Sequence, residues 1–150
     1  MGLFFNNYEK KRKQAIAKVE FPRHKRILED SISLIKSTQN LSTLINRHEI
    51  AQEEYSWIKS QMNAGVPIYF KSNGYFPAEL KEYANVNIVR IADAEYAKYA
   101  AKKGTLKTDK AKENLHDKYT NVLNDCLFAL LTAKNQKECI SEIAGLITKL

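Results

Sequence analysis

Residues 27–62 read ILEDSISLIKSTQNLSTLINRHEIAQEEYSWIKSQM, and this stretch contains the clearest folding signal of the chain. Its apolar residues recur at steps of mostly three and four, which is the period of an α-helix and not of a strand. They are Leu28, Ile32, Ile35, Leu41, Leu44, Ile45, Ala51, Tyr55 and Ile58. The polar run at 37–40, Ser-Thr-Gln-Asn, favours caps and turns, so we expect it to divide the stretch into two helices. One long helix is the alternative.

Helical patterns continue on both sides of this stretch. Residues 6–20 have helix-forming composition, and Pro22 then either opens the next helix or kinks the chain. Residues 109–132 show a clear helical period, with Thr108 or Asp109 as the N-cap. These patterns predict helices over most of the chain.

The chain must turn within residues 63–77, because this segment combines two prolines and two glycines with an Asn73-Gly74 pair. Asn-Gly is the dipeptide preferred in tight hairpin turns, and the flanking residues are strand-like in composition. We therefore expect a short aromatic loop or hairpin here.

Residues 78–103 fit two structures. We favour one helix that ends before Gly104, since alanines recur through its second half. The alternative is a small α/β fold with strands near 67–71 and 86–91 and with Asp93 capping the helix that follows.

A last helix follows residue 134, where Asn135 and Glu138 have the spacing of a capping box. The predicted fold class is therefore all-α: a helical bundle of five or six helices with a short aromatic loop or hairpin near residues 63–77. At 150 residues, the chain is long enough for a single domain with its own core.

The positive charge of the chain lies mainly at its N-terminal end. Residues 1–26 contain eight cations and two glutamates, a net charge of +6 within a total of +7. The cations are Lys10, Lys11, Arg12, Lys13, Lys18, Arg23, Lys25 and Arg26. We call residues 1–26 the basic arm and treat 27–150 as a single helical domain. Such a segment favours a polyanion, an acidic lipid surface or an acidic protein as partner.

A second basic segment surrounds Gly104. It contains six lysines and one aspartate between residues 98 and 112, a net charge of +5. A fold that places this segment beside the basic arm would create one positive face that binds phosphates. A solvated turn is the alternative.

Aromatic residues gather near the middle of the chain, where residues 55–83 contain seven of them. This density is typical of a recognition surface. The alternative is that the rings pack the loop onto the bundle. The seven are Tyr55, Trp57, Tyr69, Phe70, Tyr75, Phe76 and Tyr83.

Each local pattern that resembles a catalytic or metal site lacks a required member. Glu113-x-x-His116 has the spacing of a carboxylate-bridged di-iron site, but the chain has no second Glu-x-x-His. His48-Glu49 begins like a zinc-protease helix, but Gln52 stands where the second histidine belongs. Two Ser-x-x-Lys pairs, Ser33 with Lys36 and Ser56 with Lys59, lack the companion motifs of penicillin-recognising enzymes. We expect no cofactor and no metal.

Cys126 and Cys139 lie within apolar helical patterns and have no disulfide or metal spacing, so we expect buried free thiols. The sequence shows no apolar stretch of membrane-spanning length and no signal-peptide pattern. We expect a cytoplasmic protein.

These observations predict a non-enzymatic interaction or adaptor protein that contacts a protein partner, or a second copy of itself through residues 27–62. Alternatives are a nucleic-acid-binding protein that contacts phosphates, and peripheral association with an anionic membrane through Leu3, Phe4, Phe5 and Tyr8. An enzyme without local motifs is a further alternative. The expected contact residues are Lys10, Lys11, Arg12, Lys13, Arg23, Lys25, Arg26, Tyr69, Phe70, Tyr75 and Phe76.

Overall fold

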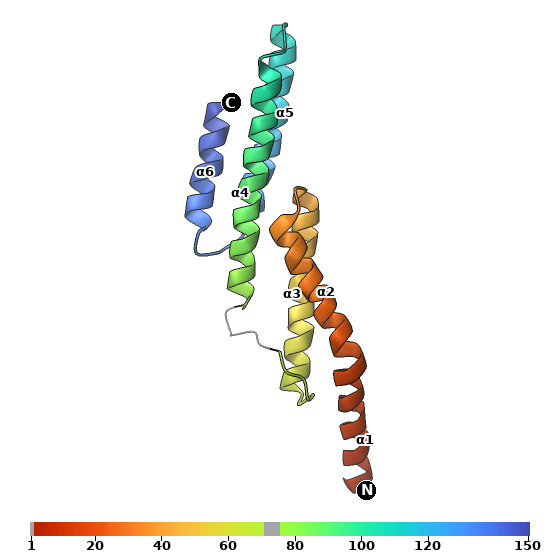
Figure 1. Cartoon of the computed structure of the whole chain (residues 1–150). Coiled ribbons are helices and arrows are strands. Elements are labelled where there is room, and N and C mark those ends of the chain that lie inside the picture. Colours follow the sequence, from red (N-terminus) through yellow and green to blue (C-terminus); the bar gives the residue numbers. More distant parts are fainter. Residues whose placement is uncertain (1, 71–75) are drawn as a thin grey trace.

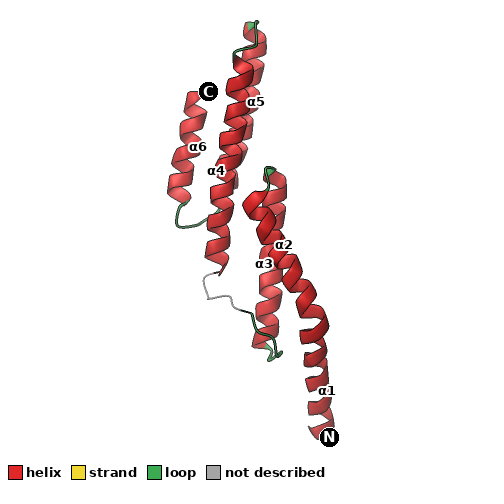
Figure 2. Ribbon diagram, viewed as in Figure 1, coloured by secondary structure: helices red, strands yellow, loops and turns green. Residues whose placement is uncertain are grey.

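The computed structural model describes residues 2–70 and 76–150, with side chains from residue 7 onward apart from that of Phe76. These residues form α-helices and no strand (Figures 1 and 2). The elements are α1 (Gly2–Ala15), the π-helical turn η1 (Ile16–Glu20), α2 (Phe21–Ser37), α3 (Leu41–Asn63), α4 (Phe76–Lys103), α5 (Asp109–Ala129) and α6 (Gln136–Lys149). The all-α prediction is confirmed.

The α/β alternative is wrong, because residues 86–91 lie inside α4. Their strand-like composition reflects burial on several sides of a helix. Ala84, Ile88 and Ala92 are fully buried and follow each other at steps of four residues, while Val89 and Ile91 widen the apolar face. Asp93 therefore lies within the same helix and caps nothing.

The elements α1, η1 and α2 form one continuous helix. In η1 the Phe21 N–H donates to the Ile16 carbonyl, so this turn contains one residue more than an α-helical turn. Pro22 follows at once, and a proline both lacks an N–H and crowds the carbonyl four residues earlier. The wider turn accommodates Pro22 without breaking the helix.

The turn at 38–40 divides residues 27–62 into α2 and α3, as the sequence predicts. Asn40 is the N-cap of α3, where its Oδ1 accepts from the Thr43 N–H at 2.9 Å. The two helices run antiparallel and bury Leu28 and Ile35 from α2 against Leu44 and Ile58 from α3.

The 28-residue helix α4 connects the α2–α3 pair with the α5–α6 pair. Its N-terminal half packs on α2 and α3, and it also packs against α5 and α6. Asn87, which is buried, donates from Nδ2 to the carbonyls of Ile35 and Thr38, both at 2.8 Å. Because the last carbonyls of a helix have no partner within it, Asn87 completes the end of α2 from across the interface.

Asn85, two residues before Asn87 on α4, binds backbone groups of the α5–α6 connection in a similar way. Its Nδ2 donates to the Leu131 carbonyl and its Oδ1 accepts from the Leu131 N–H, each at 2.7 Å. Farther along, the Tyr99 hydroxyl donates to the Leu150 carbonyl at 2.9 Å. These bonds fasten α5 and α6 to α4.

One cap prediction is confirmed and one is wrong. Thr108 caps α5, where its Oγ1 accepts from the Ala111 N–H at 3.1 Å. Asn135 precedes α6 but makes no cap bond, and its buried Oδ1 has no hydrogen-bond partner among the described residues. Residues 130–132 also lie outside α5, which ends at Ala129. The chain turns early there because Leu131 is held by Asn85.

The molecule is elongated (Figure 1). The basic arm begins at one end, and the α4–α5 turn lies at the opposite end. The continuous helix is formed by the 14 residues of α1, the 5 of η1 and the 17 of α2. It is therefore longer than its antiparallel partner α3, which has 23 residues. About 13 residues, or roughly 20 Å of helix, therefore extend beyond the end of α3. Within the described part of the chain, every helix is too short or too polar to cross a membrane.

Candidate functional site

The basic arm carries its charge on side chains that are mostly exposed. Lys10, Lys11, Arg23 and Arg26 are exposed, and Lys13 is half-buried. Two carboxylates lie near arm cations: Glu9 is 3.2 Å from Arg12, and Glu29 is 3.9 Å from Lys25. Both pairs are exposed, and such pairs contribute little to stability.

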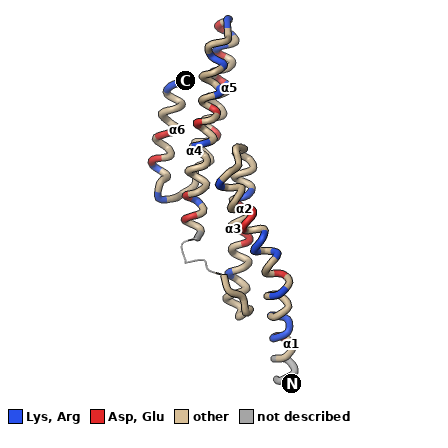
Figure 3. Tube along the Cα trace, viewed as in Figure 1, with Lys and Arg blue, Asp and Glu red and all other residues tan. Residues whose placement is uncertain are grey.

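The other six arm cations have no ion pair within residues 7–70 and 77–150. They are Lys10, Lys11, Lys13, Lys18, Arg23 and Arg26. Lys10, Lys11 and Lys13 lie on α1, which extends past the end of α3, whereas the other three lie on η1 and α2 (Figure 3). Most of the positive charge of the arm is therefore not paired with carboxylates of the described residues.

A cleft of about 430 Å³ lies between α1 and the segment that follows α3. Its lining includes Lys10 and Lys13 from α1 and Gly65 and Pro67 from the segment. Gly65 has a φ of +84°, which side-chain-bearing residues rarely adopt. A Cβ at this position would also lie 3.3 Å from the Lys13 Nζ. Glycine therefore leaves room for the lysine head group beside the backbone.

His24 differs from the other polar side chains of the basic arm. Its Nδ1 is hydrogen-bonded to the Glu54 carboxylate on α3, and its ring stacks on Trp57 with the centroids 3.7 Å apart. The side chains of His24 and Glu54 are only 20% and 16% exposed. His24 therefore joins the start of α2 to α3, although it stands between Arg23 and Lys25 in the basic arm.

The aromatic loop is only partly an exposed surface. Tyr69 is 81% exposed, but Phe70 is half-buried and packs on Tyr55 with ring centroids 6.3 Å apart. Tyr75 and the side chain of Phe76 lie outside the described residues. Of the four loop aromatics predicted as contacts, the structure therefore presents Tyr69 to a partner.

The second basic segment does not adjoin the basic arm. Lys98, Lys102, Lys103, Lys107, Lys110 and Lys112 surround the α4–α5 turn and are all exposed. We call these six lysines the basic tip. Figure 3 shows the basic arm and the basic tip at opposite ends of the molecule. The two clusters therefore do not form one positive face.

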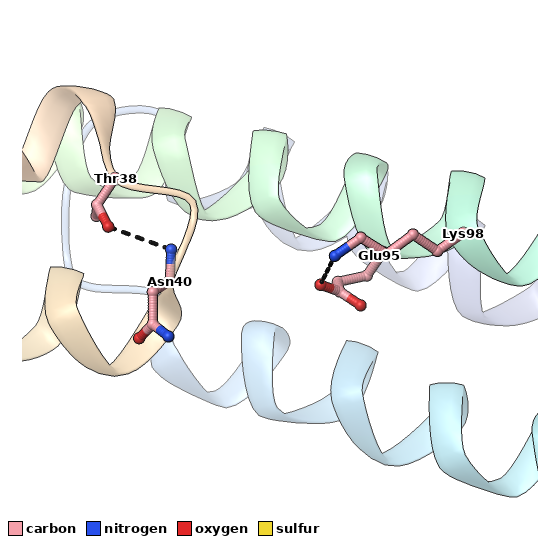
Figure 4. Close-up of polar contacts among 4 residues, drawn as sticks. All are labelled: Thr38, Asn40, Glu95 and Lys98. Atoms are coloured by element: carbon pink, nitrogen blue, oxygen red, sulfur yellow. Dashed lines mark hydrogen bonds and ion pairs between the residues drawn. The ribbon is translucent and has the colours of Figure 1, made fainter.

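The basic tip has few internal partners. Lys98 pairs with Glu95 at 3.0 Å, and Lys103 lies over the Tyr99 ring, 5.6 Å from its centroid. Figure 4 shows the Lys98–Glu95 pair on α4, opposite the α2–α3 turn in which the Asn40 N–H donates to Thr38 Oγ1. A cleft of about 250 Å³ separates these elements, and its lining includes Asn40, Glu95 and Cys126.

The catalytic candidates do not converge. His116 is exposed and near only Asp117, at 3.8 Å. Ser56 and Lys59 line a cleft of about 420 Å³ that is otherwise formed by Gln52, Tyr55, Pro77 and Leu80. As far as the described residues form it, this lining contains no histidine and no carboxylate. Among the described residues, no three His, Cys, Asp or Glu side chains form a group that could hold a metal ion.

His48 is buried on α3, and its Nε2 has no hydrogen-bond partner within the described chain. Burial lowers its pKa below 6.5, and the positive charge of Lys81 lowers it further. Ser31 on α2 is also buried with an unpartnered Oγ among the residues described. Neither side chain lines one of the clefts described above, so both read as packing positions in the α2–α3 interface.

Comparisons with protein-family models, with curated proteins and with solved structures found no match to this chain.

Proposed function

We propose that the protein is a non-enzymatic interaction protein that docks an acidic partner on its basic arm. The observation that carries the proposal is the set of six arm cations without ion pairs among the described residues, three of which lie on α1, where the helix extends beyond the bundle. Placing like charges together on one helix opposes folding, so a binding role accounts for these cations better than a contribution to stability does.

The adaptor form of this proposal takes an acidic face of a second protein as the partner. It is supported by Tyr69, which is 81% exposed, and by Tyr8 on α1, which is 64% exposed. Tyrosine is an effective contact residue because it combines a large ring with a hydroxyl. A cytoplasmic location is part of this proposal, since Cys126 and Cys139 are buried free thiols that suit a reducing compartment.

Nucleic acid is the second candidate partner, and the basic tip favours it. Lysines that surround a turn without an exposed apolar anchor suit phosphate contacts, which give affinity without sequence choice. Lysine is depleted in protein–protein interfaces. Binding through phosphates would weaken steeply as the salt concentration rises.

Binding to defined probes tests the proposal. The probes are a fluorescent polyglutamate peptide and a fluorescent DNA duplex of equal charge, titrated with the purified chain at several salt concentrations. We expect binding of at least one probe, with an affinity that falls as salt increases. Preference for the duplex would favour nucleic acid, and preference for the peptide would favour an acidic protein.

Two matched variants assign the binding to the arm. Lys10→Gln/Lys11→Gln/Lys13→Gln removes three arm charges, and Lys134→Gln/Lys137→Gln/Lys149→Gln removes three exposed charges in or beside α6. We expect the first variant to lose affinity at least about tenfold and, for the duplex, about three units of salt slope. Equal losses in both variants would refute the arm as the contact surface.

A further inference from the structure

The charge of the molecule is divided between two poles. The basic arm has a net charge of +6, and residues 98–112 have a net charge of +5. Residues 27–97 contain six cations and nine carboxylates, and residues 113–150 contain four cations and five carboxylates. The segments between and after the basic clusters are therefore net negative, at −3 and −1. Figure 3 shows the two clusters at opposite ends of the molecule, so the fold separates the excess positive charge of the chain into two regions.

The two poles are electrostatically independent. α4 has 28 residues and is therefore about 42 Å long, and the basic arm begins beyond its far end. The Debye length in physiological salt is about 8 Å. The charges of one pole therefore have little effect on the potential at the other, and a duplex shorter than this separation reaches only one pole at a time.

Helix stability does not explain the lysines of the basic tip. Lys102 and Lys103 at the C-terminus of α4 complement the helix dipole. Lys110 and Lys112, however, lie near the N-terminus of α5, where the dipole is positive and cations are unfavourable. Asp109 in the same turn offsets one of these charges, so the lysines leave this end of α5 with a net positive charge.

The chemistry of the basic tip selects among anionic partners. No large hydrophobic residue between 98 and 112 is strongly exposed in the structure, so this end has neither an apolar anchor for a protein hot spot nor a wedge for a bilayer. A nucleic-acid backbone requires only cations that meet a row of phosphates. The four lysines without an ion pair or ring contact in the described structure are Lys102, Lys107, Lys110 and Lys112.

We propose that the basic tip is a second nucleic-acid site, and that the protein holds two nucleic-acid segments at once, one at each pole. This inference rests on the nucleic-acid candidate of the proposed function and adds a second site and a bridging role. The segments are two duplexes or two distant parts of one strand, and the net negative middle of the molecule keeps them apart.

A two-duplex capture assay tests the bridge. One DNA duplex is fixed to beads, the purified chain is added at low salt, and a second duplex with a fluorescent label is then supplied. We expect the chain to retain the labelled duplex on the beads. The tip variant Lys102→Gln/Lys107→Gln/Lys110→Gln is expected to bind the fixed duplex through the arm but to capture at least about tenfold less of the second. The arm variant Lys10→Gln/Lys11→Gln/Lys13→Gln should show the same loss of capture with binding through the tip.

The controls keep the outcomes distinct. Far-ultraviolet circular dichroism establishes that each variant is folded, and Lys134→Gln/Lys137→Gln should capture as well as the unchanged chain. Undiminished capture by the tip variant would overturn the inference, because a dimer that binds through two arms would then be the bridge. Failure of the unchanged chain to bind duplex would also overturn it, while binding of polyglutamate to the arm would leave the adaptor form of the proposed function standing.

Discussion

Asn85 offers the sharpest test of how the α5–α6 connection is held to α4. Its amide exchanges two hydrogen bonds with Leu131, and Asn85 is fully buried while Leu131 is half-buried. The Asn85→Ala substitution removes both partners of the Leu131 peptide groups. Each lost bond costs about 1 kcal/mol, and each group left without a partner costs about 1–3 kcal/mol unless water reaches it. We expect a loss of about 3 kcal/mol in the free energy of unfolding.

Urea denaturation followed by circular dichroism measures this loss, and thermal unfolding should show a decrease of about 6–12 °C in Tm. Asn121→Ala, at an exposed site on α5, is the matched control and should change stability by less than about 0.5 kcal/mol. Asn85→Asp keeps the size and the acceptor but loses the donor at neutral pH. Because burial raises the pKa of a carboxyl, this variant should regain stability as the pH falls and the carboxyl becomes a donor again. A loss below about 0.5 kcal/mol in Asn85→Ala would refute the reasoning.

Three further predictions concern buried side chains. The pKa of His48 lies below 6.5 in the folded chain, so the folded state binds a proton there less readily than the unfolded state does. The free energy of unfolding should therefore be highest above pH about 6.5 and decrease below it. His48→Leu should reduce this decrease, as urea midpoints measured between pH about 7.5 and 5.5 would show. Ser31→Ala removes a buried hydroxyl without a partner in the described chain, so urea denaturation should show stability unchanged or raised by about 1 kcal/mol, and a clear loss would reveal a partner. Burial, with lesser effects from Glu95 and Asp125, raises the pKa of the Cys126 thiol to about 11. Native Cys126 should therefore react with a thiol reagent at pH about 8 at least about 100-fold more slowly than in the urea-unfolded chain, as peptide mapping would show.

The helices could be predicted from the sequence because their signals are local. The apolar period of residues 27–62 and the Asn40 and Thr108 caps each depend on neighbours within a few positions. Asn135 has the same local signal but does not cap α6, because its backbone, with φ −95° and ψ 13°, lacks the extended conformation that Asn40 and Thr108 adopt as caps. A spacing rule contains no information about that conformation.

The buried asparagines of α4 show what the sequence could not reveal. Asn85 and Asn87 bond to backbone groups 46 and 52 residues away, at Leu131 and Ile35. In the sequence they interrupt an apolar run and read as solvent-facing positions. The available signal was that they lie inside the most buried stretch of the chain, where a polar side chain must find a partner.

The location of the basic clusters follows from helix length and direction, which composition does not report. The first helix, continuous through η1, begins well past the point where α3 ends, so α1 extends beyond the bundle. The chain then returns through α3 and proceeds along α4 in the opposite direction, which carries the second cluster to the far end. In a chain with the same charges but a much shorter α4, the two basic clusters would lie within about one Debye length of each other. They would then act as a single positive site. The separation of the two basic clusters is therefore a property of the fold, and it is the feature on which the proposed bivalent binding depends.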